Sequence, residues 1–327
     1  MGFLHLVLNA IYSGPRKVVY PCRILDKTIP NEEGLNNVVC QGFLILTYRR
    51  NFSPLPNSAL TSDQGWGCLA RASQMLLARA LWCHSPSDFQ LEYFRDLDSP
   101  QGAPFSLHNM VRGVSAEGSD FRNEYWPPSQ GCKAIRWCVD EAVKRGILSC
   151  GMEVVVALGG CVSLDNVCKH LEANCAVLIL VPVRSGTSRC ITQTMFWALE
   201  HVLYFSSCVG VVGGVPNRSY YILGTCPSGM LYLDPHCVTK EALLTCDEGD
   251  TAAAIPTASD VKCVEWHRVD TSFFIGFYVA SMSAWQEFQK QLENVERQLA
   301  VRILSVMRNE SLGPCNLDIG DWPSCNE

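Results

Sequence analysis

A single cysteine stands where a protein could form a reactive thiolate. Cys68 follows a Gly-Trp-Gly run centred on Trp66, and the strongly helical stretch of residues 69–81 begins directly after it. At the first turn of a helix, unpaired N–H groups and the helix dipole favour negative charge, so they favour the ionised form of a thiol. A buried cysteine at an ordinary helix start is the alternative interpretation. The glycines on both sides of Trp66 weaken that alternative, because a packed helix start does not need them.

A thiol nucleophile needs a base, and one histidine has a neighbour that could orient it. Of the seven histidines, only His236 has an obvious helper, because Asp234 stands two residues before it at the end of an expected strand. Side chains alternate across a strand, so residues two apart project to the same face. A carboxylate held beside an imidazole fixes its tautomer and stabilises the imidazolium. In the alternative interpretation, Asp-Pro-His is a simple turn and His236 faces solvent.

Together these residues suit nucleophilic acyl transfer through a thioester. Cys68 would supply the nucleophile, His236 the base and Asp234 the group that orients the base. Such a reaction also needs a donor for the oxyanion of the tetrahedral intermediate, and the Cys68 backbone N–H is the default candidate. Tyr48 is one of ten tyrosines, and composition does not distinguish it from the others. The fold must therefore bring the Cys68 helix against a segment far downstream in the chain.

The composition is that of a well-buried globular protein. Of the 327 residues, 48% are hydrophobic and 18% are charged, and the formal net charge is −6. That charge, without a long Lys/Arg stripe, argues against a nucleic-acid partner. The 18 cysteines have no Cys-x-x-Cys spacing, so we expect reduced core thiols, no metal site and no cofactor. The apolar N-terminus has no basic n-region and no apolar run reaches the length of a membrane span, so we expect a cytoplasmic protein.

The elements expected around these residues indicate an α+β fold. Helices are expected at residues 69–81, 107–114, 132–145, 191–205 and 285–307, and strands at residues 176–183, 209–215, 219–225, 230–233 and 273–279. This order favours helices packed on a largely antiparallel sheet. Ser62 and Asp63 are of the types that cap a helix start. We expect a single domain over residues 1–308, a small helical sub-domain inserted at about residues 92–150, and a flexible C-terminal tail over residues 309–327.

Four stretches of the sequence match motifs of a known family: residues 62–68 (SDQGWGC), 104–108 (PFSLH), 213–217 (GGVPN) and 232–236 (YLDPH). They occur in the family's order, and the chain resembles the autophagins, the autophagy-related cysteine peptidases of the papain-like superfamily. The likeness covers roughly residues 18–280. It implies a papain-like cysteine protease fold, with Cys68 as nucleophile, His236 as general base and acid, and Asp234 as orienter. It also implies Tyr48 as an oxyanion-hole donor.

The resemblance further implies a mobile gate over the active-site groove. In this chain the gate would be the glycine-proline loop that contains Gly214 and Pro216. The family's gate partner is a tryptophan in a Trp-Tyr-Gly-Pro stretch, whereas this chain reads Tyr-Trp-Pro-Pro from Tyr125 onwards. Tyr125 and Trp126 are therefore both candidates. A closed gate admits glycine at the cleavage point because glycine has no side chain to clash.

The substrate implied by the resemblance is the ubiquitin-like autophagy modifier. The enzyme would cut after the modifier's C-terminal glycine for priming, and would later release the modifier from phosphatidylethanolamine. We expect a monomer that contacts the membrane transiently when it acts on the lipidated substrate. Docking of the folded modifier would bury about 800 Å² per partner. The tail lacks a clear aromatic-x-x-aliphatic docking motif, because Trp322 precedes Pro323, Ser324 and Cys325.

Three other functions fit parts of the pattern. A catalytically weak protein that sequesters the modifier would form a stable complex without turnover, although the complete Cys-His-Asp set argues against it. Redox regulation suits the many cysteines as a layer of control, since a catalytic thiolate is itself prone to oxidation. A transglutaminase-like acyl transfer shares the same catalytic logic and would require glutamine and amine substrates.

Overall fold

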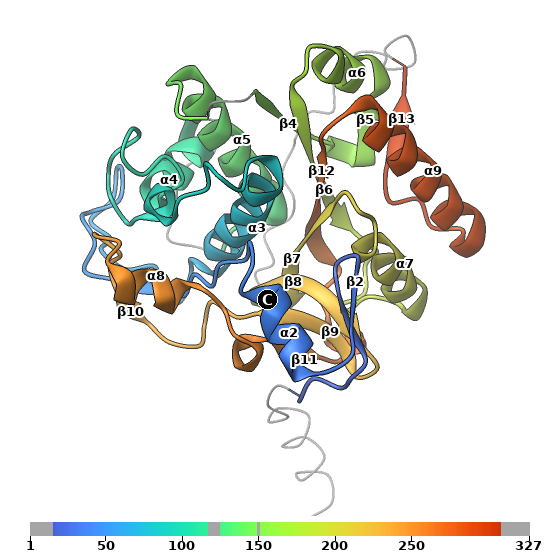
Figure 1. Ribbon diagram of the computed structural model, residues 1–327, viewed down its shortest axis with the longest axis horizontal. Helices are drawn as coiled ribbons and strands as arrows, with labels where there is room; N and C mark the ends of the chain where they lie inside the picture. The colour runs from blue at the N-terminus through green and yellow to red at the C-terminus, as the bar shows by residue number, and fades with distance from the viewer. Residues whose placement is uncertain (1–15, 117–124, 149–150, 309–327) are drawn as a thin grey trace, which may run out of the picture.

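A large, mostly antiparallel sheet forms the centre of the molecule (Figure 1). The computed structural model describes residues 16–116, 125–148 and 151–308. In these ranges the main path of the sheet runs β11-β9-β8-β7-β12-β6-β4, and β4 and β6 are its one parallel pair. Its strands are β4 (Met152–Val156), β6 (Ala176–Arg184), β7 (Cys208–Val215), β8 (Arg218–Cys226), β9 (Gly229–Leu233), β11 (Lys262–Val264) and β12 (Ser272–Val279). A short hairpin of β1 (Cys22–Ile24) and β2 (Lys27–Ile29) joins the sheet at β8.

Helices cover both faces of this sheet. α3 (Cys68–His84) and α5 (Pro128–Lys144) lie on one face, and α6 (Leu164–Glu172), α7 (Gln193–Leu203) and α9 (Met282–Leu299) lie on the other (Figure 1). The alternation along β12 explains how one strand serves both faces. Phe274 reaches Gly131 of α5, whereas Phe277 packs on Phe288 of α9 with ring centroids 4.8 Å apart.

The expected α+β arrangement of helices on a largely antiparallel sheet is confirmed. The helices predicted at residues 69–81, 107–114, 132–145 and 191–205 correspond to α3, α4 (Leu107–Ala116), α5 and α7. The predicted strands correspond to β6, β7, β8, β9 and β12. These elements have strong apolar periodicity or continuous apolar runs, because each is buried against a neighbouring layer.

The long C-terminal helix predicted at residues 285–307 is wrong at its end. α9 ends at Leu299, and Ala300 adopts a left-handed conformation with φ of 52°. The chain then extends, and β13 (Ser305–Met307) pairs in parallel with β5 (Cys161–Ser163). Ile303 and Leu304 are buried in this extended segment, so apolar residues continue the helical pattern after the helix itself has stopped.

The region predicted as a helical insertion contains η1 (Leu91–Phe94), α4 and α5. α4 and α5 pack against each other, and α5 also contacts α3 and the sheet strands β4, β6 and β12. Whether residues 92–150 form a sub-domain of their own stays a prediction, as does the single domain over residues 1–308. The predicted flexible tail, residues 309–327, lies outside the described residues.

Two very short strands connect segments that are distant in the sequence. β3 (Arg49–Arg50) pairs in parallel with β10 (Lys240–Glu241). β3 lies before the helix that begins at Cys68, and β10 follows His236. The pairing therefore brings the segment before Cys68 next to the segment after His236. α2 (Glu32–Val39), α8 (Glu248–Ala254), η2 (Leu158–Gly160), η3 (Ala258–Asp260) and η4 (Trp266–Arg268) complete the described elements.

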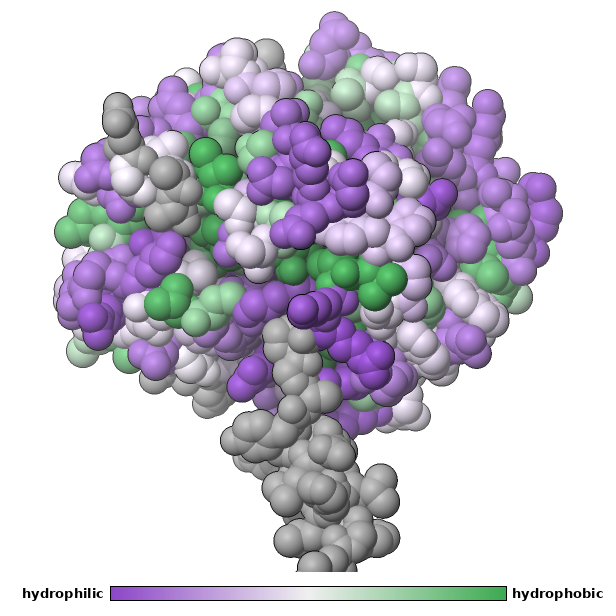
Figure 2. Space-filling model, turned by 60° about the horizontal axis from the view of Figure 1, so that its bottom comes forward, coloured by the Kyte–Doolittle hydropathy of each residue, from purple (hydrophilic) through white to green (hydrophobic). Residues whose placement is uncertain are grey.

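The described surface mixes hydrophilic and hydrophobic side chains. Figure 2 shows one face on which the hydrophobic side chains form small separate patches. The large apolar side chains that are exposed come from different elements: Val19, Tyr125, Val143, Leu158, Trp197, Val238, Leu244 and Ile255. In the described ranges no helix has both the length and the apolar composition needed to cross a membrane. The cysteines of these ranges carry free thiols.

Candidate active site

Cys68 is the first residue of α3, and it is 2% exposed. The expectation that Ser62 or Asp63 caps this helix is wrong, because Gly67 occupies the cap position and makes no side-chain hydrogen bond. Asp63 forms an ion pair with Arg71 instead, and Ser62 donates its hydroxyl to a backbone carbonyl. With no capping carboxylate, the positive end of the helix dipole acts on Cys68 without a side-chain anion at the cap.

A buried ion network fixes the start of α3 to its surroundings. Arg71 Nε lies 2.5 Å from Asp63 Oδ2, and Arg71 Nη2 lies 2.8 Å from Asp96 Oδ1. Asp63 also accepts the backbone N–H of Arg49 at 2.6 Å, and Asp96 accepts the backbone N–H of Leu243 at 2.8 Å. Burial disfavours the guanidinium charge, but the two carboxylates outweigh it and raise the pKa of Arg71. The network therefore joins α3 to the segments that contain β3 and follow β10.

Asp234 and His236 meet through a turn. β9 ends at Leu233, so the two residues lie beyond the strand and do not share a strand face, in contrast to the sequence expectation. Asp234 Oδ1 accepts the backbone N–H of His236 at 2.9 Å, which closes an Asx turn. The same oxygen lies 2.7 Å from His236 Nδ1. Asp-Pro-His is therefore a turn, as in the alternative interpretation, but the turn places the His236 ring against the Asp234 carboxylate and not in solvent.

Electrostatics couple the three side chains. Burial disfavours the Cys68 thiolate, but hydrogen bonds with His236 and the backbone of Ser219 outweigh burial and lower the pKa of Cys68. Burial likewise opposes the imidazolium, yet Asp234 and Cys68 raise the pKa of His236 to about 8. Burial would raise the pKa of Asp234, but its hydrogen bonds with His236 and the Lys262 charge lower it to about 2. All three shifts favour an imidazolium between two anions.

Tyr48 lies beside both Cys68 and His236. Its ring meets the His236 ring edge to face with centroids 5.2 Å apart, and its hydroxyl hydrogen-bonds with Cys68. Burial and the Cys68 charge raise the pKa of Tyr48, so the hydroxyl keeps its proton and can donate it. The backbone of Tyr48 donates to the Pro235 carbonyl at 3.0 Å and accepts the Lys240 N–H at 2.8 Å. The strand pairing of β3 with β10 thus holds this tyrosine against the Asp-Pro-His turn.

The glycine-proline loop is the tight hairpin between β7 and β8. Val215 pairs with Arg218, which leaves Pro216 and Asn217 as the two central residues of the turn. Asn217 has φ of 66°, and proline followed by such a residue is the combination typical of a type II turn. A Cβ at Gly214 would lie 2.2 Å from the Arg218 carbonyl oxygen, so this position requires glycine.

The two candidate gate partners occupy different environments. Tyr125 is 45% exposed, and its hydroxyl lies 2.6 Å from the hydroxyl of Ser219, the residue that pairs with Gly214. Trp126 is 2% exposed and lies against Trp66, with ring centroids 6.2 Å apart. Tyr125 is therefore the candidate that contacts the hairpin, whereas Trp126 packs behind the glycine-flanked tryptophan that precedes Cys68.

Sequence reasoning missed several residues of the site. The Tyr220 ring meets the His236 ring edge to face with centroids 5.7 Å apart and stacks on Tyr232 at 4.2 Å, so His236 contacts a second tyrosine ring besides that of Tyr48. Lys262 Nζ lies 3.1 Å from Asp234 Oδ2. Tyr220 lies outside the four matched stretches, and no pattern in the sequence marks it. Lys262 belongs to no recognised motif, and its position beside Asp234 follows only from the pairing of β11 with β9.

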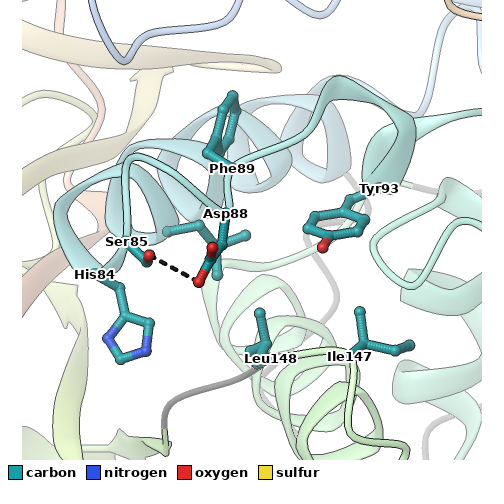
Figure 3. A pocket seen from close by; sticks show the side chains of 8 residues that line it. His84, Ser85, Asp88, Phe89, Tyr93, Ile147 and Leu148 are labelled. Carbon is teal, nitrogen blue, oxygen red and sulfur yellow. Dashed lines mark hydrogen bonds between the residues drawn. The ribbon is translucent and has the colours of Figure 1, made fainter.

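A separate pocket lies at the far end of α3 (Figure 3). An α-helix rises about 1.5 Å per residue, so the length of α3 separates this pocket from Cys68 by about 25 Å. Its polar groups are paired: Ser85 donates to Asp88 at 2.9 Å, and His84 lies 2.9 Å from the Tyr278 hydroxyl. The lining residues are Leu81, His84, Ser85, Asp88, Phe89, Tyr93, Ile147 and Leu148. In the described ranges no group of three or more His, Cys, Asp or Glu side chains is placed to hold a metal ion.

A cysteine at a helix start, an imidazole beside it and an antiparallel sheet that carries the imidazole are the features of a papain-like cysteine peptidase. A family comparison gives the same class: residues 37–291 match the Peptidase C54 catalytic domain. The chain belongs to the C54 family of cysteine peptidases, and the resemblance to the autophagins is confirmed.

Named relatives from fungi and plants agree with this assignment. The chain is 27% identical to a probable cysteine protease atg4 of Aspergillus niger over 304 residues, which is 80% of this chain and 73% of the relative. It is 26% identical to a cysteine protease ATG4 of Medicago truncatula over 309 residues, 82% of this chain and 61% of the relative. It is 29% identical to a probable cysteine protease atg4 of Botryotinia fuckeliana over 270 residues, 77% of this chain and 60% of the relative. The protein is thus a thiol protease of autophagy.

Proposed function

We propose that this peptidase cleaves after the C-terminal glycine of a ubiquitin-like autophagy modifier, both to prime the modifier and to release it from phosphatidylethanolamine. The observation that carries the proposal is the contact of Cys68, whose pKa is lowered, with a His236 that Asp234 holds at 2.7 Å. The matched family and the names of the relatives support this substrate class.

In the proposed reaction, Cys68 is the nucleophile and His236 the general base and acid. The Cys68 thiolate attacks the glycyl carbonyl carbon and forms a tetrahedral oxyanion. The oxyanion collapses to a thioester as the C–N bond breaks, and His236 gives its proton to the departing amine. Water then attacks the thioester while His236 takes its proton, and Cys68 leaves as the thiolate. Asp234 keeps the imidazole in the required tautomer throughout.

The oxyanion is stabilised by two donors in this proposal. One is the Cys68 backbone N–H, which as the first residue of α3 has no intrahelical acceptor. The other is the Tyr48 hydroxyl, which retains its proton because its pKa is raised. Donors fixed in place before the reaction stabilise developing charge without reorganisation.

The hairpin with Gly214 and Pro216 forms the gate over the substrate in this proposal. Tyr125 is its partner, because its hydroxyl meets Ser219 at the base of the hairpin. A narrow passage beneath the hairpin would accept glycine at the cleavage point and exclude larger side chains. Tyr125 and Val238 expose apolar surface near the site, which suits docking of a folded protein substrate.

The direct test is incubation with a modifier precursor that extends past its glycine. Mass spectrometry should find a new C-terminus at that glycine, with many turnovers per enzyme molecule. Cys68→Ala should abolish cleavage and leave the thermal midpoint near that of the wild type. A stoichiometric complex without cleavage would instead identify a catalytically weak binding protein, and cleavage by Cys68→Ala would reject the nucleophile.

We further propose that the enzyme works in the cytoplasm as a monomer and touches membranes only while it acts on the lipidated substrate. Vesicles that carry the modifier on phosphatidylethanolamine should retain the Cys68→Ala variant in a flotation assay. Plain vesicles of the same lipid composition should not retain it. Equal retention by both would contradict the proposal of substrate-dependent contact.

A further inference from the structure

We propose that Lys262 is a positioning residue for the catalytic set, which holds the second oxygen of Asp234 so that the first stays aligned with His236. This inference rests on the proposed function of Asp234 and His236. It starts from a lysine that lies outside every matched motif of the sequence and contacts Asp234. Lys262 Nζ lies 3.1 Å from Asp234 Oδ2, on the side of the carboxylate that does not face the imidazole.

Strand pairing explains how Lys262 reaches this position. Lys262 is the first residue of β11 and pairs with Tyr232 of β9. Paired residues of antiparallel strands point to the same face, and Asp234 follows Tyr232 by two residues. The lysine therefore starts from a neighbouring strand and extends along the sheet to the Asx turn. Its backbone is held by strand pairing with β9 rather than by a loop.

A second contact fixes the lysine side chain. Lys262 Nζ donates to Cys237 Sγ at 2.7 Å, so its ammonium group bridges the residues on either side of the Asx turn. The Lys262 side chain is 25% exposed and that of Asp234 is 12% exposed. A half-buried ammonium with two acceptors has less freedom than a surface lysine, so it can hold the carboxylate in one orientation.

The contact matters because the two carboxylate oxygens of Asp234 have different partners. Oδ1 of Asp234 accepts both the backbone N–H and the ring Nδ1 of His236. If Lys262 were absent, Oδ2 would lose the ammonium contact, and rotation of the carboxylate would lengthen the bond to the imidazole. The imidazolium would then be stabilised less well, and so would the Cys68 thiolate that depends on it.

The test depends on the charged and titratable groups around Lys262 and around Cys68. The groups that face Lys262 and its two acceptors are Asp234, Cys237, Tyr232, Lys240 and Asp260. Those that face Cys68 are His236, Tyr48, Tyr125 and the backbone of Ser219. Loss of carboxylate alignment makes the imidazolium less favourable and, with it, the Cys68 thiolate, so the pKa of Cys68 should rise in Lys262→Met.

The experiment compares three variants of the full chain. Lys262→Met removes the ammonium and keeps most of the aliphatic stem. Lys262→Arg keeps a charged donor. Lys27→Met is the matched control, because Lys27 is an exposed lysine on β2 of the same sheet. Thermal midpoints are measured first, so that any loss of folding is separated from the catalytic effect.

Two readouts are needed. For cleavage of the modifier precursor, Lys262→Met should lower kcat roughly 10-fold or more with little change in KM, because a small misplacement of a catalytic group reduces the rate after binding. Lys262→Arg should return kcat to within roughly threefold of wild type. In the second readout, iodoacetamide alkylation of Cys68 is followed by peptide mass spectrometry. The pH midpoint should rise by roughly half a unit or more in Lys262→Met and stay constant in Lys27→Met.

The second readout does not require peptidase activity, so the two proposals can fail separately. If the wild type does not cleave the precursor but the alkylation midpoint shifts in Lys262→Met, the inference stands and the proposed function fails. An unchanged midpoint in Lys262→Met overturns the inference, even if kcat falls. Equal loss of kcat in Lys262→Arg and Lys262→Met would also overturn it, because a positioning charge should be replaceable by another.

Discussion

At the scale of single residues, the site depends on a histidine that several groups hold in its charged form. His236 contacts the rings of Tyr48 and Tyr220, is hydrogen-bonded to Asp234 through Nδ1 and contacts Cys68. Each contact that raises the pKa of His236 involves a negative or acceptor group. The same contacts that prepare the site for reaction therefore also tie the protonation state of His236 to folding.

Replacement of Asp234 by alanine is expected to lower kcat/KM by at least about 100-fold, because the imidazole would lose its tautomer and orientation. Steady-state cleavage of the modifier precursor measures this effect. Asp98→Ala is a suitable control, because that aspartate pairs with Arg112 on the surface. A rate near that of wild type in Asp234→Ala would assign the orienting role to another residue.

The pH dependence of stability follows from the sign of the His236 shift. The pKa of His236 rises from 6.5 to about 8 in the folded protein, so folding favours the protonated ring. Its stabilising effect is fully present below about pH 6.5 and is lost as the pH rises through about 8. Urea unfolding of wild type and His236→Ala should therefore differ more at pH 6 than at pH 9. A difference that grows with pH would contradict the assigned shift.

At the scale of elements, β3, the start of α3 and the segment after β10 are held in register by buried charges. Arg71 contacts both Asp63 and Asp96, and these carboxylates accept backbone N–H groups from the two other segments. A buried charge without its partner is costly, so this network defines one arrangement of the elements that present Tyr48, Cys68 and His236.

Replacement of Arg71 by methionine is expected to reduce the free energy of unfolding by about 3–5 kcal/mol, because it leaves two buried carboxylates unpaired. Urea unfolding at neutral pH measures the change. Arg50→Met provides the contrast, because the Arg50–Glu241 pair is exposed and should contribute far less. Similar losses in the two variants would show that burial of the Arg71 network does not dominate its energetics.

The β7–β8 hairpin gives a second expectation at this scale. Gly214→Ala places a Cβ 2.2 Å from the Arg218 carbonyl oxygen, and the overlap should cost about 1–3 kcal/mol of stability. Gly249→Ala is the control, because Gly249 is exposed in α8 and a Cβ there would lie 3.3 Å from the Asp247 side chain. Thermal unfolding compares the two. An unchanged midpoint in Gly214→Ala would mean that the hairpin opens to accept the methyl group.

The sequence predicted the parts of the site that local chemistry determines. A thiol at a helix start and a carboxylate two residues from an imidazole have recognisable patterns, so Cys68, Asp234 and His236 could be proposed before the fold was known. Lys262 and Tyr220 act through strand pairing, and nothing near them in the sequence marks their role. Asp63 matches a helix cap by type, but a buried arginine one turn into the helix takes its carboxylate instead. The end of α9 escaped prediction because Ile303 and Leu304 continue its apolar pattern in an extended segment.

At the scale of the whole molecule, the sheet is shared by two helical layers. α3 and α5 pack on one face and α7 and α9 on the other, and the buried apolar side chains form one continuous cluster. β12 contributes to both layers through alternate residues, with Phe274 on one side and Phe277 on the other. Neither layer can therefore lose its packing without exposing the sheet that supports the turn with Asp234 and His236.

This arrangement leads to an expectation for the unfolding of the whole chain. Ile135 lies in the buried face of α5, and Phe288 lies in α9 on the opposite side of the sheet. Ile135→Ala and Phe288→Ala should lower the free energy of unfolding by about 2–5 and about 3–5 kcal/mol. Because both layers share one core, each variant should still unfold in one cooperative transition, with tryptophan fluorescence and far-UV circular dichroism giving the same midpoint. Two separate transitions would mean that one helical layer unfolds by itself, the layer with α5 in Ile135→Ala or the layer with α9 in Phe288→Ala. The prediction of a single domain over residues 1–308 would then be replaced by one of two domains.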